Sequence, residues 1–214
     1  MKDIAVFGAG GFGKEVSCLI RLINEKNPVW NFVGFFDDNP VLRGTKDEYG
    51  EVHGGMEELN KWETPLALAI AIGNPVVLKK IVENVTNTNI YFPNLIAPTT
   101  VFLDEKSVVW GKGNIICSNC LISLRAKIGN FNIFNGYIPL GHDTVIGDYN
   151  VVMPSVNISG GVQIGDCNFL GVQSVVLQYL KIGNNVRIGA NSVMMRNSKD
   201  NCLYLGNPAK KTSI

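Results

Sequence analysis

The chain has little net charge, no long apolar run and no secretion signal, and each absence excludes a class of protein. Its 19 basic and 18 acidic residues give a formal net charge of +1, without a long run of Lys or Arg. Such a chain has no electrostatic footprint for nucleic acid, so we expect no nucleic-acid partner. The longest apolar stretches, such as Leu66 to Ile72, are far too short to cross a bilayer, so we expect no membrane partner.

The chain also lacks the cysteine pattern of a disulfide-rich or metal-binding protein. Its start, Met1-Lys2-Asp3, leads directly into an apolar strand and does not resemble a signal peptide. The five cysteines are an odd and scattered set. Cys117 and Cys120 are spaced C-x-x-C, but no second pair completes a zinc site. We therefore predict a reduced, cytoplasmic protein without a bound metal.

What the chain does contain is a repeat in its second half. Ile-Gly followed by Asn or Asp recurs every 18 residues, and the four copies begin at Ile128, Ile146, Ile164 and Ile182. Inside this interval lies a period of six, because every sixth position from Ile116 to Met194 is apolar. A period of six fits neither a helix nor an alternating strand, and it is a signature of β-helices.

The repeat predicts a triangular prism. Three hexapeptides make one coil of 18 residues, whose periodic aliphatic side chains point inward. Residues 18 apart are then vertical neighbours at about 4.8 Å, and Gly, Asn and Asp suit the corners, where φ is often positive. The pattern from Ile116 to about Met195 predicts between four and five coils, and we expect Ile96 to Lys112 to form a less regular first coil. Such a solenoid can also be a scaffold alone.

The first ninety or so residues predict a different domain. We expect strands over residues 4–7, 32–36, 66–72 and 90–92, and helices after residue 13, over 55–61 and over about 76–84. Alternating strands and helices indicate a small Rossmann-like parallel sheet with right-handed crossovers. The junction is expected between Pro93 and Pro98, which divides the chain into domains 1–93 and 94–214, the second with a C-terminal tail.

A glycine-rich loop joins the first strand to the first helix of this domain. Gly8-x-Gly10-x-x-Gly13 has the setting of a dinucleotide fingerprint, in which glycines let the backbone approach a pyrophosphate at the helix N-terminus. Asp37 and Asp38 end the next strand, where carboxylates can hold ribose hydroxyls or a base edge.

Three interpretations of this loop remain open: a simple glycine turn, a full nicotinamide site, and a site for a diphosphate-linked small molecule such as a nucleotide sugar. About ninety residues hold only half of the usual six-stranded sheet, so we favour the last. Ligands of open α/β sheets bind at the carboxyl ends of the strands. The candidate pocket residues at this edge are Gly10, Gly11, Asp37, Asp38, Gly73 and Asn74.

The two histidines have different surroundings in the sequence. His53 lies in an expected loop and is predicted to be solvated. His142 follows the periodic Leu140 by two residues, so we expect it at an outward-facing corner, where a neutral imidazole can act as a base near pH 7. Asp143 can orient the ring if the corner bends, since neighbouring side chains of a strand point to opposite faces. Asn135 is also expected within reach of the ring.

Gly160 lies 18 residues after His142 and should stack about 4.8 Å from it. A glycine N–H beside a base is a natural oxyanion donor for acyl transfer. The alternative is an exposed histidine with a turn glycine above it.

Several motifs occur in a fixed order along nearly the whole chain: the glycine loop, Phe35-Phe36-Asp37-Asp38-Asn39, Ile72-Gly73-Asn74, the hexapeptide prism, Gly141-His142-Asp143 and Gly206-Asn207-Pro208-Ala209-Lys210. This combination resembles the sialic acid O-acetyltransferase-like family of sugar O- and N-acyltransferases. Its well-known members, such as the bacillosamine-pathway enzyme and the perosamine enzymes, acetylate nucleotide-linked 4-amino sugars.

The resemblance implies a homotrimer of left-handed β-helices, with acetyl-CoA in the groove between adjacent prisms and the nucleotide sugar held by the N-terminal domain. By position, His142 matches the general base, Asp143 the acidic residue beside it, and Asn135 an asparagine near it. Gly160 matches the glycine whose N–H contacts the thioester carbonyl, and Asp37 and Asp38 match the acidic pair that meets the nucleotide. The residues implied along the CoA groove are Gly160, Gly171, Asn207, Pro208 and Lys210.

Two positions depart from the family pattern. Phe12 stands where many members have a histidine in the first loop, so this substrate contact changes, and Val151 stands where many have a second histidine that contacts CoA. Neither is the base, so the two changes concern the identity of the substrate and of the donor acyl group rather than the chemistry of transfer.

We therefore predict direct acetyl transfer from acetyl-CoA to an amino group of a nucleotide-linked, UDP-4-amino-dideoxy sugar, with His142 as general base. No Ser or Cys lies in an evident nucleophile–base arrangement, so no acyl-enzyme is expected. The alternatives are a sugar or sialic acid O-acetyltransferase, a non-catalytic hexapeptide scaffold and an NAD-dependent oxidoreductase. A hexapeptide carbonic anhydrase needs three histidine ligands to zinc. His142 is the one histidine of the prism, which argues against this function.

Overall fold

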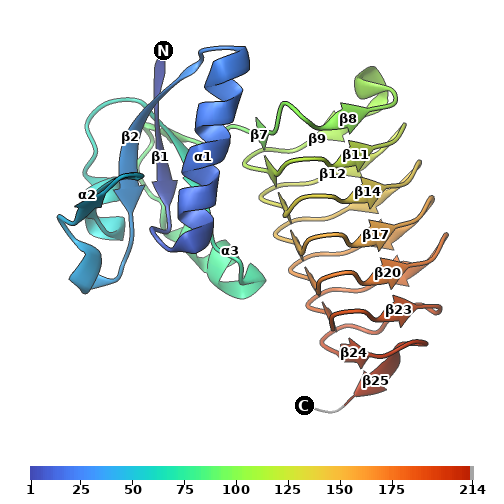
Figure 1. The fold of residues 1–214 in the computed structure, drawn as a ribbon. Helices are drawn as coiled ribbons and strands as arrows, with labels where there is room; N and C mark the ends of the chain where they lie inside the picture. Colours follow the sequence, from blue (N-terminus) through green and yellow to red (C-terminus); the bar gives the residue numbers. More distant parts are fainter. Residues whose placement is uncertain (213–214) are drawn as a thin grey trace. The chain divides into compact units, whose positions relative to one another are not determined.

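The structure is a computed structural model that describes residues 1–212. The chain forms two compact units, Met1–Pro98 and the residues from Thr99 onward. Figure 1 colours them along the sequence, with the helices confined to the blue and green part. The predicted boundary after residue 93 lies slightly before this division. Within residues 1–212, no helix is long and apolar enough to span a bilayer.

The first unit contains a six-stranded sheet in the order β3-β4-β2-β1-β5-β6. Its strands are β1 (Lys2–Phe7), β2 (Trp30–Phe36), β3 (Lys46–Asp47), β4 (Gly50–Gly54), β5 (Leu66–Ile70) and β6 (Ile90–Tyr91). Its helical elements are α1 (Gly11–Lys26), η1 (Pro40–Leu42), α2 (Met56–Asn60) and α3 (Pro75–Asn84), and the short β7 (Leu95–Ile96) follows. All pairs in the sheet are parallel except β3 with β4, which confirms the expected α/β class.

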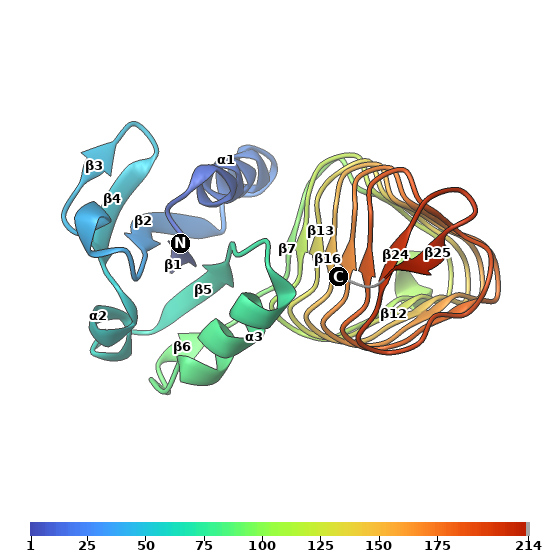
Figure 2. The same cartoon turned by 90° about the horizontal axis from the view of Figure 1, so that it is seen from below.

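The central strands of this sheet are covered on both faces. Every residue of β5 is buried, and so are Ile4 to Phe7 of β1, as expected of parallel strands between two layers of helices. Val16, Leu19 and Ile20 of α1 are buried at helical spacing. Figure 2 shows α1 on one side of the strands and α2 and α3 on the other.

The hairpin formed by β3 and β4 is not predicted by the sequence pattern, and it changes the position of His53. This residue lies in β4, and its Nε2 is 2.7 Å from the carbonyl oxygen of Val33. Its ring lies 5.8 Å from that of Phe36 and 5.7 Å from that of Trp62, measured between centroids. The prediction of a solvated loop histidine is therefore wrong, because the strand turns the ring toward the buried Phe36 and the half-buried Trp62.

The second unit is a parallel β-helix whose strands form three stacks (Figure 1). The first stack contains β10 (Ile115–Ile116), β13 (Ile133–Phe134), β16 (Val151–Val152), β19 (Phe169–Leu170), β22 (Arg187–Ile188), β24 (Leu203–Leu205) and β25 (Lys210–Thr212). The second contains β8 (Val101–Phe102), β11 (Leu121–Ile122), β14 (Pro139–Leu140), β17 (Asn157–Ile158), β20 (Val175–Val176) and β23 (Val193–Met194). The third contains β9 (Val109–Trp110), β12 (Lys127–Ile128), β15 (Val145–Ile146), β18 (Gln163–Ile164) and β21 (Lys181–Ile182).

The register of the β-helix is the one that the repeat predicts. Ile122 pairs with Leu140, and Phe134 pairs with Val152, each 18 residues further on. Every periodic position from Ile116 to Met194 is at most 3% exposed. The strands β8 and β9, joined by η2 (Glu105–Ser107), pair with β11 and β12, so the expected first coil is also present. Only β24 and β25 are antiparallel within this part of the described chain.

The corners do not use their glycines as expected. The glycines of the Ile-Gly-Asx copies do not have positive φ. A Cβ on Gly129 would overlap Asp148 of the next coil, and one on Gly147 would overlap Asp166, so these glycines are required by close approach between coils. The positive φ values occur elsewhere at intervals of six residues, for example at Tyr137 with a φ of 55°.

A column of buried asparagines links successive coils. Asn132, Asn150 and Asn168 are fully buried, and each donates its backbone N–H to the side-chain oxygen of the asparagine 18 residues before it, at 2.8 to 3.0 Å. Asn114 begins the column and the N–H of Val186 ends it, at 2.7 Å from the oxygen of Asn168. The column satisfies backbone donors that the turns would otherwise leave buried and unpaired.

Candidate active site

His142 lies at the corner that follows β14, and it is in direct contact with Asp143. Asp143 has a φ of 57°, which bends the corner and turns its carboxylate back toward the ring. The distance from Oδ2 of Asp143 to Nδ1 of His142 is 2.7 Å. The bend is therefore what permits a contact that adjacent residues of an extended strand would not make.

The other edge of the imidazole lies over Gly160 in the next coil. A Cβ on Gly160 would lie 2.5 Å from Nε2 of His142 and 2.7 Å from its Cε1. Gly161 donates its N–H to the carbonyl oxygen of His142 at 2.7 Å, which fixes the two corners against each other. Within residues 1–212 the N–H of Gly160 itself donates to no other group. The structure thus brings His142, Asp143 and Gly160 together, with a backbone donor beside the ring.

The ionisation of Asp143 indicates which ring nitrogen is basic. The hydrogen bond from Arg125, and after it the one from His142, lowers the pKa of Asp143 to about 2. A carboxylate can only accept, so Nδ1 of His142 is the donor in this bond, and Nε2 is the ring nitrogen on the side of Gly160. Because the pKa is lowered, the carboxylate form is present at neutral pH and is lost only as the pH falls toward about 2.

Arg125 is a member of this cluster that the sequence interpretation missed. Its Nε lies 2.6 Å from Oδ1 of Asp143, and its Nη2 lies 3.0 Å from Oδ2. Arg125 precedes Asp143 by 18 residues, so the repeat itself contained the signal that the two corners stack.

A shallow hollow of about 280 Å³ opens beside His142 on the face formed by β11, β14 and β17. It is lined by Leu121, Ser123, Pro139, Leu140, Gly141, His142, Asn157, Ile158 and Ser159. The side chain of His142 is 50% exposed, so a reactant can reach Nε2 from solvent. The corner thus combines a base, an amide donor and an adjacent space.

Asn135 lies at a different corner of the same coil. It follows β13 in the first stack, whereas His142 follows β14 in the second. Within residues 1–212, Nδ1 of His142 donates its hydrogen bond to Asp143 and not to Asn135. A role for Asn135 near the ring therefore stays a prediction, and one chain by itself does not provide it.

The glycine loop of the first unit leads into an open helix terminus. Gly10 is the N-cap of α1, and no side chain caps the helix there. A Cβ on Gly10 or Gly11 would meet nothing within 4 Å, whereas one on Gly13 would overlap the carbonyl oxygen of Gly8. Gly13 is therefore needed for packing, while Gly10 and Gly11 leave room for a ligand at the helix N-terminus. Phe12, between Gly11 and Gly13, is half-buried.

The acidic pair has structural bonds of its own. Asp37 accepts the N–H of Ala9 at 2.8 Å and that of Asn39 at 2.9 Å, so it ties the glycine loop to the end of β2. Asp38 accepts the N–H of Met56 at 2.8 Å, at the start of α2. The sequence interpretation assigned both to a ligand and did not foresee these bonds.

Asn74 caps α3, since its Oδ1 accepts the N–H groups of Val76 and Val77 at 3.0 and 3.2 Å. Gly73, before it, is exposed. The glycine loop, Asp37 and Asn74 follow β1, β2 and β5, which are neighbours in the sheet. The predicted pocket residues therefore share one edge of the sheet.

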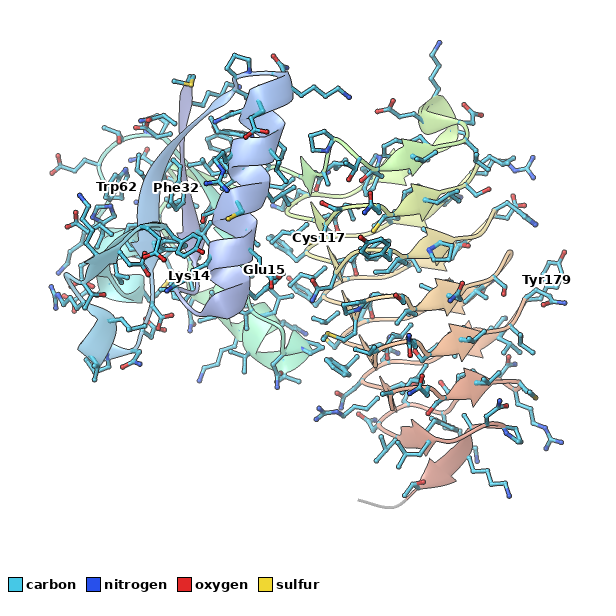
Figure 3. All side chains as sticks on the ribbon, in the orientation of Figure 1. Lys14, Glu15, Phe32, Trp62, Cys117 and Tyr179 are labelled. Atoms are coloured by element: carbon cyan, nitrogen blue, oxygen red, sulfur yellow. The ribbon has the colours of Figure 1, made fainter. Side chains whose placement is uncertain are left out.

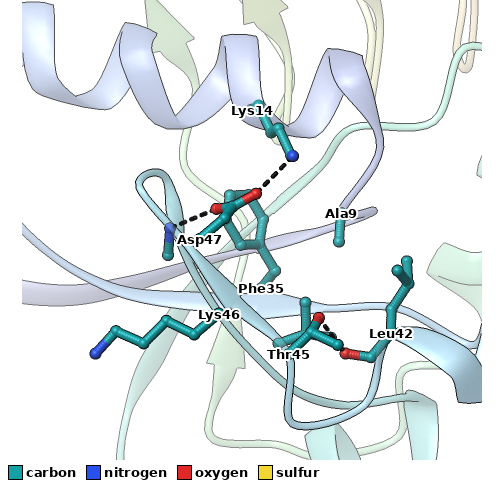
Figure 4. A pocket seen from close by; sticks show the side chains of 9 residues that line it. Ala9, Lys14, Phe35, Leu42, Thr45, Lys46 and Asp47 are labelled. Carbon is teal, nitrogen blue, oxygen red and sulfur yellow. Dashed lines mark hydrogen bonds and ion pairs between the residues drawn. The ribbon is translucent and has the colours of Figure 1, made fainter.

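A second hollow lies next to this edge, between α1 and the hairpin of β3 and β4 (Figure 4). It is lined by Ala9, Lys14, Phe35, Leu42, Thr45, Lys46, Asp47, Gly50 and Val52. Nζ of Lys14 lies 2.6 Å from Oδ2 of Asp47, and this pair holds the hairpin against the first turn of α1. The bond raises the pKa of Lys14 and lowers that of Asp47. The sequence interpretation missed the residues of the hairpin that line this hollow, because it did not predict the hairpin.

The predicted CoA-groove residues lie in the second unit. The N–H of Gly171 donates to the carbonyl oxygen of Ile188, and a Cβ on Gly171 would lie 2.6 Å from the nitrogen of Ala190. Asn207 and Pro208 are exposed in the turn between β24 and β25, joined by a cis peptide bond, and Lys210 begins β25. In the part of the chain that the structure describes, no group of three His, Cys, Asp or Glu could hold a metal ion.

The order of the two units, an α/β domain followed by a hexapeptide β-helix, is shared with acyltransferases of known structure. Residues 3–85 match the family described as the PglD N-terminal domain. A curated relative, the GDP-perosamine N-acetyltransferase of Escherichia coli O157:H7, is 28% identical over 179 residues, which are 83% of this chain and 79% of the relative. Other curated relatives match in part, and the chain spans 32% and 45% of the length of two of them.

Several solved structures match over nearly the whole chain. WeeI from Acinetobacter baumannii AYE is 30% identical with a TM-score of 0.87, and the match covers 99% of this chain and 100% of that one. A mutant of perosamine N-acetyltransferase from Caulobacter crescentus, in complex with CoA and GDP-perosamine, is 25% identical with a TM-score of 0.89, and the match covers 100% and 98% of the two chains. The β-helix is of the left-handed kind, and the chain belongs to the nucleotide-sugar N-acetyltransferase family of hexapeptide acyltransferases.

Proposed function

We propose that the protein transfers an acetyl group from acetyl-CoA to an amino group of a nucleotide-linked 4-amino sugar. The observation that carries this proposal is the corner where Nε2 of His142 faces the backbone of Gly160 and Asp143 holds Nδ1. The relative that acetylates GDP-perosamine, and the matching structure with CoA and GDP-perosamine bound, support the donor and the class of acceptor.

The proposed chemistry is direct transfer with His142 as general base. Nε2 takes a proton from the sugar amine as its nitrogen attacks the thioester carbonyl, so a C–N bond forms. The N–H of Gly160 donates to the oxyanion of the tetrahedral intermediate, and Asp143 keeps the ring oriented through Nδ1–H. The C–S bond then breaks, and the proton held by His142 passes to the departing thiolate.

The acceptor is held, in this proposal, by the first unit. The residues that we assign to the nucleotide sugar are Gly10, Gly11, Phe12, Asp37, Asp38, Gly73 and Asn74. The open N-terminus of α1 suits a diphosphate, because its N–H groups and its partial positive charge are not used by a capping side chain. The prediction that accompanies the family resemblance is a UDP-linked sugar, whereas one relative is a GDP-perosamine N-acetyltransferase and one matching structure holds GDP-perosamine, so both nucleotides belong in the test.

The donor is held, in this proposal, between the β-helices of a homotrimer in the cytoplasm. Gly160, Gly171, Asn207, Pro208 and Lys210 would line that groove. The half-exposed ring of His142 supports a site that a second copy covers, because a shallow hollow on one face cannot exclude water from a thioester. Light scattering coupled to size exclusion measures the expected mass of three chains.

A thiol-release assay tests the function. Acetyl-CoA is offered with a panel of UDP-, GDP- and dTDP-linked sugars that carry either a 4-amino or a hydroxyl group at the accepting position. We expect thiol release with one 4-amino sugar and none with the protein bearing His142→Ala. Release with the hydroxyl series alone would replace N-acetylation by O-acetylation. Binding of acetyl-CoA without release from any acceptor would favour a non-catalytic scaffold.

A further inference from the structure

Arg125 occupies the corner one coil before Asp143, and both its backbone and its side chain are held by hydrogen bonds. Its φ of 55° makes it an outward corner residue, and its backbone N–H donates to Oγ of Ser107 at 2.7 Å. Its guanidinium then bonds both carboxylate oxygens of Asp143, at 2.6 and 3.0 Å. A planar fork on a planar carboxylate fixes distance and orientation together.

We propose that Arg125 is a positioning residue for His142: it holds the Asp143 carboxylate in the plane that receives Nδ1–H, and its positive charge opposes the stabilisation of the imidazolium by that carboxylate. This inference rests on the proposed function in one respect, namely that His142 is the base.

Orientation is the first part of the argument. The side chain of Asp143 is 42% exposed, so without a restraint its carboxylate would rotate among solvent-facing rotamers. Oδ2 accepts from both Nη2 of Arg125 and Nδ1 of His142, while Oδ1 is held by Nε of Arg125. The carboxylate cannot turn away from the ring without breaking the fork. A lysine would keep the charge but not this geometry.

Charge is the second part. A lone carboxylate beside an imidazole favours the imidazolium, whereas a cation on the far side of that carboxylate opposes it. The other ionisable groups on the elements next to this corner are Glu105 and Lys106 in η2, Lys127 in β12, and Tyr179, which packs over Gly161. In the described chain none of these four groups bonds to His142 or Asp143, and Tyr179 projects outward in Figure 3.

The pKa of the carboxyl agrees with this geometry. Arg125 is the largest cause of the lowered pKa of Asp143, ahead of His142, and Asp143 in turn raises the pKa of Arg125. The three side chains thus form a row of cation, carboxylate and imidazole, in which the carboxylate stays ionised whatever the protonation of the ring.

The test compares Arg125→Ala and Arg125→Lys with Lys127→Ala, which removes one positive charge from the same coil without touching Asp143. Lys127 is exposed in β12, so it is a matched control for net charge. The titration of the His142 imidazole is followed by NMR. The chain has only two histidines, and His142→Asn identifies the signal of the other. The acid limb of the kcat/KM profile is measured in parallel.

We expect Arg125→Ala to move the titration midpoint of His142 to higher pH by about half a unit and to lower kcat by about tenfold. The acid limb should move in the same direction. Arg125→Lys should leave the midpoint in place but lose part of kcat, and Lys127→Ala should change neither.

An unchanged midpoint and kcat in Arg125→Ala would overturn the inference, and so would a rise confined to the KM for acetyl-CoA, which would make Arg125 an anion-binding residue instead. The NMR titration does not depend on turnover. A wild-type protein without transferase activity would therefore refute the proposed function, while the midpoints would still decide the role of Arg125.

Discussion

The two units of this protein specify their structures in different ways. In the β-helix, a buried residue such as Ile146 has equivalents 18 residues before and after it, and all of them occupy the same environment. In the α/β unit, β1 pairs with β2 on one side and with β5 on the other, and nothing repeats. A repeated environment can be inferred by counting, whereas a unique one depends on contacts between segments that the sequence does not place side by side.

Glycine illustrates the contrast. Gly129 and Gly147 each occupy the same tight approach between coils, so one explanation serves both. Gly13 has a single function, which is to let α1 approach the carbonyl oxygen of Gly8, while Gly11 three positions after Gly8 faces open space. Within one short loop, then, one glycine is required by close packing and another is not, although their sequence surroundings are similar.

The largest expected effect separates the two histidines, one in each unit. His142→Ala should reduce turnover by about 10²–10⁴-fold, because it removes the proton acceptor, and it should leave stability almost unchanged, because the ring is half exposed. His53→Ala should do the reverse, since His53 bonds Val33 and packs against Phe36 and Trp62. Initial rates and thermal melts of both variants give the comparison. Full activity of His142→Ala would remove it as the base.

The second prediction concerns the glycine loop of the α/β unit. Gly13→Ala should destabilise this unit by about 1–3 kcal/mol or more, because the new methyl group overlaps the backbone of Gly8. Gly11→Ala is the matched control and should be neutral for stability, since it enters open space. Urea unfolding followed by tryptophan fluorescence measures the difference. Equal stability of the two variants would show that α1 can shift away from β1 at little cost.

The third prediction concerns the asparagine column of the β-helix. Asn150→Ala should lower the free energy of unfolding by about 1–3 kcal/mol, because it leaves the buried N–H of Asn168 without an acceptor. Asn157→Ala serves as control, because that side chain is exposed and bonds only the nearby carbonyl oxygen of Ser155. Chemical denaturation of both variants provides the measurement. If Asn150→Ala unfolds at the same denaturant concentration as the wild-type protein, the asparagine column does not contribute to the stability of the β-helix.

The smallest expected effect concerns the residues assigned to the nucleotide sugar. Asp37→Ala should raise the KM for the nucleotide sugar by about tenfold, more than it changes kcat, because it removes a carboxylate that also ties down the glycine loop. Asp3→Ala removes a carboxylate at the start of β1, which is half-buried and accepts a hydrogen bond from the side chain of Asn31, and should leave the KM as it is. Steady-state kinetics with the preferred acceptor distinguishes them. A KM that stays constant in Asp37→Ala would mean that the ligand does not use this edge.

Much of the candidate site follows from counting. The interval of 18 residues placed Gly160 against His142, and the period of six placed His142 at an outward corner. The same arithmetic stacks Arg125 on Asp143, but it gives corner positions and not side-chain directions, so the fork between them was missed. The contact between His142 and Asp143 needed a φ of 57° at Asp143, a value that no spacing rule provides.

The α/β unit was less predictable, for a physical reason. The strands β3 and β4 are short and polar, and β4 gains its place only by pairing with β2, so a local pattern did not distinguish it from a loop. His53, Lys14 and Asp47 owe their surroundings to that pairing. Asp37 and Asn74 were recognised by their positions at strand ends, but their bonds to Ala9 and to the start of α3 are visible only in three dimensions.

The sequence by itself determined the coil, its register and the corner at which the histidine lies. The reason is that an apolar side chain at every sixth position can be buried in each coil only if 18 residues make one turn. Only the tertiary structure decided which atoms of that row meet. The bend at Asp143, the fork from Arg125 and the open face of Gly160 arise where neighbouring coils press on each other, and such contacts depend on dihedral angles and distances that a period cannot contain.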